Sequence, residues 1–218
     1  MKKNGSTASL AYRAFQPDEA PPLVLASGSA IRRQILENAG LVFEVEPSAI
    51  DEDAVKTALL KDVDIQAGDL ASLLAEAKAL DVSGRRPGEI IIGADQVLSF
   101  ESVLLSKSAD IDGARRQLLD MAGKTHSLIS AAVLARDGET LWRQADTVHV
   151  TMRDFSPAFL GAYLAEAGDI VLESVGGYQL EGLGAQLFER IEGDYFTVLG
   201  LPLLPLLGAL RDHAALGQ

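Results

Sequence analysis

The stretch LVLASGSAIRR, residues 23–33, joins a short apolar run to a helical pattern through small residues. Its apolar start predicts a buried strand, and residues 27–29, Ser-Gly-Ser, predict a tight turn. Apolar residues then recur at helical spacing over 31–39, so a helix begins at about the last of the small residues. Acidic side chains are favoured in the first turn of a helix, yet Arg32 and Arg33 stand there. The pair therefore raises the question of which anion it binds.

One interpretation of this turn is a phosphate site. Backbone N–H groups after Ser27 and Ser29 are free at a helix start, and an arginine fork matches phosphate oxygens. The alternative is an ordinary helix, with Ser29 as its N-cap and both arginines as solvated surface. The turn alone leaves both interpretations open.

Composition narrows the class of protein. The chain has 218 residues, 48% of them hydrophobic, which suits one large domain or two lobes that share a core. Cysteine is absent, which excludes disulfides, a thiolate nucleophile and cysteine-ligated metal. A net charge of −12 argues against a nucleic-acid-binding surface, but the few cations could gather around a small anion. Acidic groups at the same place could hold a divalent metal.

The order of elements predicts an α/β fold with a mixed sheet, in a domain over residues 22–214 that follows a flexible tail, 1–21. Strand and helix patterns alternate. Residues 126–152 predict two long strands joined by a hairpin turn at Asp137-Gly138, which requires antiparallel pairing. The segment GDLASLLAEAKAL, 68–80, predicts a helix. Its expected apolar face comprises Leu70, Leu73, Leu74, Ala77 and Leu80, with Glu76 and Lys78 flanking it.

No segment predicts an export signal or a membrane span. The opening Met-Lys-Lys is followed by no apolar region of about 7–15 residues, and no run of about 18 apolar residues occurs. We therefore expect a cytoplasmic, soluble protein.

Asp95 is the second unusual feature. In GEIIIGADQVLSF, 88–100, an apolar strand is interrupted at residues 93–96, which places this carboxylate at the end of the strand. Sites open at the carboxyl ends of strands in α/β sheets, and a carboxylate there can bind a metal or take a proton from water. The alternative is an aspartate that only makes a turn. Glu52, Lys78 and Lys107 are further charges that could converge there, each a weak signal alone.

Other catalytic classes lack their motifs. His126, His149 and His213 show no metal-ligand spacing, no G-x-S-x-G nucleophile elbow occurs, and no Walker A motif is present. The GLGAQL segment, 182–187, is at most a fragment of a dinucleotide-binding fingerprint, without its strand–turn–helix context.

Taken together, several segments resemble the Maf family of nucleoside triphosphate pyrophosphatases over about residues 23–210. The matching stretches occur in the family's order and spacing, and the GADQV and IEGDYFTVLGLPL segments are the most specific. They are LASGSAIRRQIL, Asp51-Glu52, AEAKA, IIGADQVL, LLSK, MAGKTHSLISAAVL and EGLGAQLFERIEGDYFTVLGLPL. One departure is Ser29-Ala30-Ile31, where relatives usually have Ser-Pro followed by Arg or Trp.

The resemblance implies an elongated, two-lobed fold like that of inosine triphosphatases, built around a long mixed sheet with an active-site cleft between the lobes. It implies hydrolysis between the α- and β-phosphates of a nucleotide, giving a nucleoside monophosphate and pyrophosphate. A divalent metal is implied, with Mg²⁺ expected and Mn²⁺ or Co²⁺ as alternatives. Apart from the resemblance, a homodimer is one assembly considered for the chain. By position, the substrate-binding residues are Ser27, Arg32, Lys78 and Lys107, the catalytic base is Asp95, and Glu52 with Asp95 holds metal or water.

Three positions carry the implied base specificity: Ile31, Gln96 and Glu181. In the branch of the family that cleaves dTTP and UTP, these three positions typically hold Arg, Thr and Gln. In the branch that cleaves 7-methyl-GTP, they typically hold Trp, Gln and Glu. Two of three therefore favour the second branch, although isoleucine cannot stack on a cationic ring as tryptophan can. A glutamate accepts hydrogen bonds from a guanine edge, so a purine substrate similar to 7-methyl-GTP is favoured. The competing hypothesis is a nucleotide-binding regulator of division or growth, with hydrolysis incidental or lost.

Overall fold

The computed structural model describes residues 15–61 and 65–217, and its centre is a seven-stranded mixed sheet. The strand order is β2-β1-β3-β5-β6-β7, with β4 also paired to β3. β1 runs parallel to β2 and β3, and all other pairs are antiparallel. The strands are β1 (Leu23–Leu25), β2 (Glu44–Val45), β3 (Ile90–Phe100), β4 (Val103–Leu105), β5 (Thr125–Arg136), β6 (Glu139–Met152) and β7 (Phe188–Glu192). The expected α/β class with a mixed sheet is confirmed.

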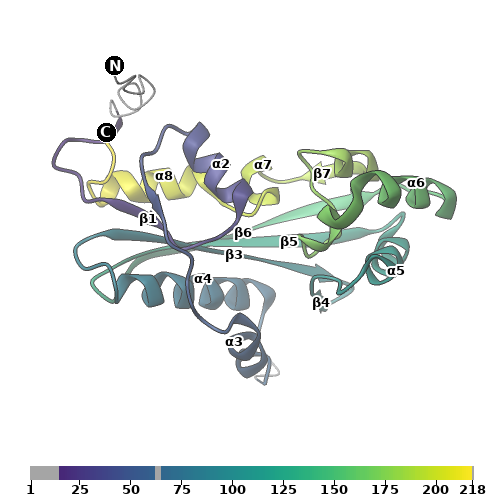
Figure 1. Cartoon of the computed structure of the whole chain (residues 1–218), viewed down its shortest axis with the longest axis horizontal. Helices are drawn as coiled ribbons and strands as arrows, with labels where there is room; N and C mark the ends of the chain where they lie inside the picture. Colours follow the sequence, from purple (N-terminus) through teal and green to yellow (C-terminus); the bar gives the residue numbers. More distant parts are fainter. Residues whose placement is uncertain (1–14, 62–64, 218) are drawn as a thin grey trace, which may run out of the picture.

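Helices cover both faces of this sheet and one end of it (Figure 1). α4 lies on one face, α2 and α8 lie on the other, and α5 and α6 form the second lobe at the far end of the long strands. The helical elements are α2 (Ala30–Asn38), α3 (Glu52–Leu59), α4 (Ala67–Ser83), α5 (Ile111–Met121), α6 (Pro157–Ala167), η2 (Gly168–Leu172), η3 (Leu183–Leu187), α7 (Tyr195–Val198) and α8 (Leu203–Asp212). None of the helices in the described ranges is long and apolar enough to cross a bilayer.

The described part of the N-terminal segment begins at residue 15. Residues 1–14 of the expected flexible tail lie outside the described residues. Beyond them, the Phe15 carbonyl accepts a hydrogen bond from the Gly217 N–H, and the Gln16 side chain bonds both backbone groups of Val42. These contacts place the segment beside the C-terminus.

The predicted hairpin is present, with its turn at Asp137 and Gly138. Both residues have positive φ angles, 51° and 81°, as a two-residue type I′ turn requires. The turn joins β5 to β6, which pair from Thr125 with Thr151 to Arg136 with Glu139. These two strands and β3 give the sheet its length.

β3 differs from the sequence expectation, because it runs without a break through residues 93–96. Each of these residues pairs with β5, from Gly93 with Val133 onward. Gly93 does not end the strand but lets α4 approach it closely. A Cβ built there would lie 2.2 Å from the Ala75 carbonyl oxygen and 2.7 Å from the Ala79 Cβ.

The expected apolar face of α4 is only partly correct, because Leu70 and Leu74 are buried as expected but the rest of the buried face is shifted around the helix. The residues that pack on the sheet are Leu70, Ala71, Leu74, Ala75, Lys78, Ala79, Val82 and Ser83. Leu73, Ala77 and Leu80 are only partly buried. Small alanines let the helix backbone lie close to β3, and this contact selects the alanine face over the leucine-rich one. Lys78 therefore lies within the buried face and does not flank it.

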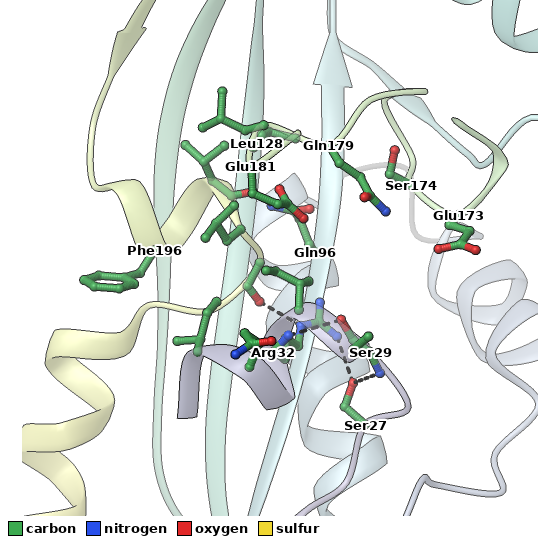
Figure 2. Close-up of a pocket in the computed structure, with 18 of the residues that line it drawn as sticks. Ser27, Ser29, Arg32, Gln96, Leu128, Glu173, Ser174, Gln179, Glu181 and Phe196 are labelled. Carbon is green, nitrogen blue, oxygen red and sulfur yellow. Dashed lines mark hydrogen bonds between the residues drawn. The ribbon is translucent and has the colours of Figure 1, made fainter. Parts of the chain in front are cut away.

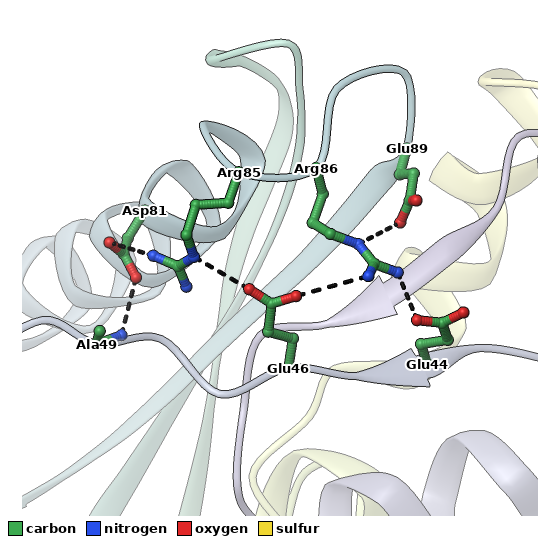
Figure 3. A network of polar contacts seen from close by, with 7 residues as sticks. All are labelled: Glu44, Glu46, Ala49, Asp81, Arg85, Arg86 and Glu89. Carbon is green, nitrogen blue, oxygen red and sulfur yellow. Dashed lines mark hydrogen bonds and ion pairs between the residues drawn. The ribbon is translucent and has the colours of Figure 1, made fainter.

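Two arginines just after α4 tie the helix to the segment around β2 (Figure 3). They form a chain of ion pairs, in which Arg85 binds Asp81 and Glu46, and Arg86 binds Glu44, Glu46 and Glu89. Asp81 also accepts a hydrogen bond of 2.8 Å from the Ala49 backbone N–H. That bond, with the Arg85 contact, holds the pKa of the Asp81 carboxyl below its usual range. The network thus fixes the chain that leads to Glu52 at the start of α3.

Candidate active site

The site lies at a gap along one edge of β3. β1 pairs with Ile90–Ile92 and β4 pairs with Leu98–Phe100, and no described strand pairs with the residues between them on this edge. The gap exists because the chain leaves β1 through the small-residue turn into α2. A cleft of about 1160 Å³ opens here, lined by the turn, by α2, by the middle of β3 and by the segment 173–181.

Asp95 lies in the middle of β3, opposite Ala131 of β5, so its predicted place at a strand end is wrong. It is β1 that ends beside it, and the cleft opens beyond the carboxyl end of that shorter strand. Side chains alternate between the faces of a strand, so Asp95 and Gln96 point to opposite faces. Asp95 contacts α4, and Gln96 contacts the backbone of α7.

Lys78 brings two carboxylates together. Its Nζ lies 2.6 Å from Asp95 Oδ1 and 2.6 Å from Glu52 Oε2. Lys78 and Asp95 are buried, with 8% and 5% of their surface exposed, whereas Glu52 is exposed. The three side chains come from α4, β3 and the first turn of α3, so only the folded chain assembles them.

Burial raises the pKa of the Asp95 carboxyl above its ordinary value, although the charges of Lys78 and Arg32 act in the opposite direction. Burial also opposes ionisation of Glu52, but there the Lys78 hydrogen bond, with the charges of Lys78, Arg32 and Lys107, outweighs it and lowers the pKa. The pKa values of these two neighbouring carboxyl groups are thus shifted in opposite directions. Burial shifts Asp95 toward its protonated form, and the contact with Lys78 shifts Glu52 toward its ionised form.

The turn after β1 forms a compact polar cradle (Figure 2). Ser29 caps α2 by accepting from the Arg32 N–H, and Ser27 Oγ accepts from the Ser29 N–H. The Arg32 guanidinium donates from Nε to the Gly200 carbonyl at 2.8 Å and from Nη1 to the Ala94 carbonyl at 3.0 Å and to Ser27 Oγ at 3.2 Å. Arg32 thereby donates a hydrogen bond to the Ala94 carbonyl of β3, on the edge where no described strand pairs with β3. Within the described residues, its Nη2 group has no hydrogen-bond acceptor.

Arg33 differs from its neighbour. Its side chain is exposed and pairs with Glu37 one turn later, at 2.7 Å. The surface interpretation therefore holds for Arg33, while Arg32 faces the cleft. Because successive residues of a helix point in different directions, α2 directs Arg32 to the cleft and Arg33 to the solvent.

All nine sequence-predicted site residues line the same cleft: Ser27, Ile31, Arg32, Glu52, Lys78, Asp95, Gln96, Lys107 and Glu181. Lys107 is exposed, on the segment after β4. Glu181 and Gln179 lie with Gln96 toward the end of the cleft away from Ser27 and Ser29 (Figure 2). The roles assigned to these residues remain predictions.

Sequence reasoning missed the residues that hold the cleft wall. His126, buried on β5, lies 2.6 Å through Nε2 from the Tyr178 hydroxyl and anchors the segment that carries Glu181. Ser130 lies on the same strand and contacts Gln96 and the Thr197 carbonyl. A polar residue inside the apolar run 128–135 was the available signal for Ser130.

The carboxylate pair suits a divalent cation. Glu52 and Asp95 already lie on either side of one positive group, the Lys78 ammonium. Among the described residues, no cluster of three or more His, Asp or Glu side chains could hold a metal by itself. Mg²⁺ commonly binds through one or two carboxylates together with substrate phosphates, so this donor set fits an ion that arrives with a nucleotide.

The sequence pattern of a family described as "Maf-like protein" matches residues 22–213. The chain belongs to this family. The Maf-like chain is 54% identical over 189 residues to the 7-methyl-GTP pyrophosphatase of Brucella suis, covering 87% of this chain and 94% of that protein. It is 53% identical to the 7-methyl-GTP pyrophosphatase of Mesorhizobium japonicum, with 89% and 97% covered. It is also 50% identical to a nucleoside triphosphate pyrophosphatase of Paramagnetospirillum magneticum, with 88% and 99% covered.

Proposed function

We propose that this Maf-like chain is a nucleoside triphosphate pyrophosphatase. It hydrolyses the bond between the α- and β-phosphates, releasing a nucleoside monophosphate and pyrophosphate. The observation that carries this proposal is the contact of Lys78 with both Asp95 and Glu52, next to the Ser27–Arg32 cradle in one cleft. Relatives about half identical in sequence and bearing pyrophosphatase names support it.

Each charged residue has a task in this reaction. Arg32 Nη2 and the free N–H groups of the turn bind phosphate oxygens, and Lys107 neutralises further negative charge. Asp95 accepts the proton of the attacking water, because burial keeps this carboxylate basic. Lys78 holds Asp95 and Glu52 in position and contributes positive charge near the phosphates.

The proposed enzyme depends on a divalent cation, Mg²⁺ in the first place and Mn²⁺ or Co²⁺ as alternatives. Glu52 and Asp95 would hold the ion, which neutralises phosphate charge when it is bound. A triphosphate carries about four negative charges, more than the cations of the cleft can balance alone. Pyrophosphate release measured with and without EDTA, and after each of these metals is added back, tests this dependence.

The proposed substrate is a purine nucleotide similar to 7-methyl-GTP. Gln96 and Glu181 line the cleft, and relatives of this name support the choice. Specificity constants for 7-methyl-GTP, GTP, dTTP, UTP and CTP provide the test. A clear preference for dTTP or UTP would contradict the assignment of these two residues.

The second candidate is a nucleotide-binding regulator of division or growth with little hydrolysis. A binder has less need of a basic carboxylate, so the raised pKa of Asp95 favours the enzyme. Purified protein incubated with a nucleotide panel and Mg²⁺, followed by a pyrophosphate assay, separates the two. If no nucleotide of the panel yields pyrophosphate, the proposal that the protein is an enzyme is excluded.

We further propose that the protein acts in the cytoplasm, where free nucleotides are hydrolysed, and that it forms a homodimer. No nucleic-acid polymer is expected as a partner, because the net charge is −12. Cell fractionation tests the location, and light scattering of the purified chain tests the dimer.

A further inference from the structure

The segment 173–181 forms one wall of the cleft but contains no helix or strand. Figure 2 shows Glu173, Ser174 and Gln179 along this wall. Its backbone closes short turns on itself, as from the Gly177 N–H to the Ser174 carbonyl at 3.3 Å. Such turns give the segment a local shape, but they do not fix its place in the molecule. That place depends on contacts with other elements.

Two helices of the second lobe hold the backbone of this wall. Gln117 of α5 donates through Nε2 to the Val175 carbonyl, and the Tyr163 hydroxyl of α6 donates to the Gly177 carbonyl at 3.1 Å. Both contacts engage peptide groups, so they do not depend on the side chains of the wall. They place the middle of the wall against α5 and α6.

Tyr178 is the side chain through which the wall enters the second lobe. The residue is buried, with 6% of its surface exposed, and its ring meets the Phe188 ring edge-on at 4.7 Å between centroids. Its hydroxyl lies 2.6 Å from His126 Nε2 on β5. The Ser174 hydroxyl bonds both the backbone N–H and the carbonyl of Tyr178. Displacement of the Tyr178 ring therefore displaces the wall around it.

His126 serves Tyr178 as a hydrogen-bond acceptor. One proton lies between the hydroxyl and Nε2, and within the described residues the buried Nδ1 has no partner. If His126 donated, both the hydroxyl hydrogen and the Nδ1 lone pair would lack a partner, whereas donation by Tyr178 leaves only the Nδ1–H without one. The ring proton therefore belongs on Nδ1 of a neutral imidazole. Burial supports this neutral form, because it lowers the pKa of His126 to about 4.

We propose that His126 is a positioning residue: by accepting the Tyr178 hydrogen bond, it keeps the 173–181 wall in the place that a nucleotide requires. Binding to a preformed wall costs less conformational entropy than binding that must first order the segment. The proposal rests on the proposed function, because it takes a nucleotide as the molecule in the cleft. Asp95, Lys78 and Glu52 come from β3, α4 and α3, so the role of His126 concerns binding and not the chemical step.

Hydrogen exchange of the full chain without nucleotide tests the anchoring. Tyr178→Phe keeps the ring and removes the hydroxyl, and His126→Leu removes the acceptor. In both variants the amides of 173–181 should exchange faster than in the wild type, whereas those of α4 should keep their rates. His126→Gln, whose side-chain oxygen can accept from the hydroxyl, should lie closer to the wild type than His126→Leu. The control His149→Leu changes an exposed histidine of β6 and should leave the wall unaffected.

Two results of this experiment would overturn the proposal. One is equal exchange of 173–181 in Tyr178→Phe and in the wild type. The other is faster exchange spread evenly over the wall and α4, because that pattern marks a loss of global stability. Tyr178→Phe carries the test by itself if His126→Leu does not fold, since it deletes a single oxygen atom.

Nucleotide binding tests the consequence for the cleft. Calorimetry with Mg²⁺ and the α,β-methylene analogue of GTP measures Kd without hydrolysis, because a carbon replaces the bridging oxygen. Kd should rise by about three- to tenfold in Tyr178→Phe, as loss of one hydrogen bond predicts. For a hydrolysed nucleotide KM should rise with Kd, while kcat stays within about twofold of the wild type. A lower kcat with unchanged Kd and KM would contradict a role in binding.

These measurements separate the positioning role from the proposed function. Binding of the analogue that weakens in Tyr178→Phe, in a protein that releases no pyrophosphate, supports the positioning role and removes the enzyme. Pyrophosphate release with the same Kd and KM in Tyr178→Phe and the wild type supports the enzyme and removes the positioning role. Failure of the wild type to bind the analogue would also remove the positioning role.

Discussion

Asp95 and Gln96 are consecutive residues of β3, and their side chains lie on opposite faces of the sheet. Asp95 contacts Lys78 of α4, and Gln96 contacts the backbone of α7. The cleft reaches both because the edge of β3 is uncovered between β1 and β4. The proposed proton acceptor and the proposed base-reading residue are thus neighbours in sequence but are held by separate parts of the fold. Substitutions can therefore affect one task without the other.

Asp95→Asn should lower turnover by about 10²–10⁴-fold while nucleotide binding changes little. The amide keeps the shape of the carboxyl but cannot accept the proton of water. Pyrophosphate release and calorimetric nucleotide binding measure the two effects. Asp120→Asn, on the exposed surface of α5, is the matched control. A rate within a few-fold of wild type would remove Asp95 from the mechanism.

Arg32→Ala should weaken both substrate binding and the fold. It removes contacts to the Gly200 and Ala94 carbonyls, and a charged hydrogen bond contributes about 1.5–3 kcal/mol. Arg33→Ala removes only an exposed pair with Glu37, which is worth about 0.3–0.5 kcal/mol. Urea titration and KM measurements compare the two variants. A larger effect at Arg33 would mean that the phase of α2 is misassigned.

Lys78→Met should move the acid side of the pH–rate profile to higher pH. Activity requires ionised Asp95, so kcat/KM rises with pH through the raised pKa of this carboxyl. Lys78 lowers that pKa, and its removal therefore raises it further. Profiles of kcat/KM against pH measure the displacement, with Lys61→Met at an exposed position as the control. An acid side unchanged in Lys78→Met would argue against Asp95 as the titrating base.

Gly93→Ala should destabilise the fold by about 1–3 kcal/mol or more, because its Cβ would overlap the Ala75 carbonyl of α4. Gly68→Ala makes the same change inside α4, where a Cβ meets nothing within 4 Å. That variant should be stabilised by about 0.4–1 kcal/mol, because alanine lowers the conformational entropy of the unfolded chain. Denaturant unfolding of both proteins gives the comparison. Equal stability would show that α4 does not pack on β3 as described.

His126 should make the fold sensitive to acid. Burial lowers its pKa to about 4, whereas an unfolded histidine titrates near 6.5. The unfolded chain thus binds more protons between these values, and the free energy of unfolding falls as pH drops through this window, by up to about 3 kcal/mol. Tm at pH 7 and pH 5 should differ less in His126→Gln than in the wild type. His149→Gln, at an exposed histidine, should keep the wild-type difference.

The sequence by itself determined the local elements and the kinds of chemistry. The strand, turn and helix at residues 23–38 and the hairpin at Asp137-Gly138 follow from residue types and spacing along the chain. The same patterns, with the family resemblance, pointed to the residues that line the cleft. Such signals can be read because turn geometry and helix capping depend on residues only a few positions apart.

Only the tertiary structure decided where the charges lie. The sequence pattern predicts a break in the strand at residues 93–96, but pairing with β5 carries β3 through them, so Asp95 lies mid-strand. Lys78 was expected beside an apolar face, but the close approach of α4 to Gly93 places it inside the buried one. Contacts between Arg32 and Gly200, and between Gln96 and Thr197, span 168 and 101 residues. No periodicity encodes such distances, because burial and hydrogen-bond partners arise only when distant segments pack together.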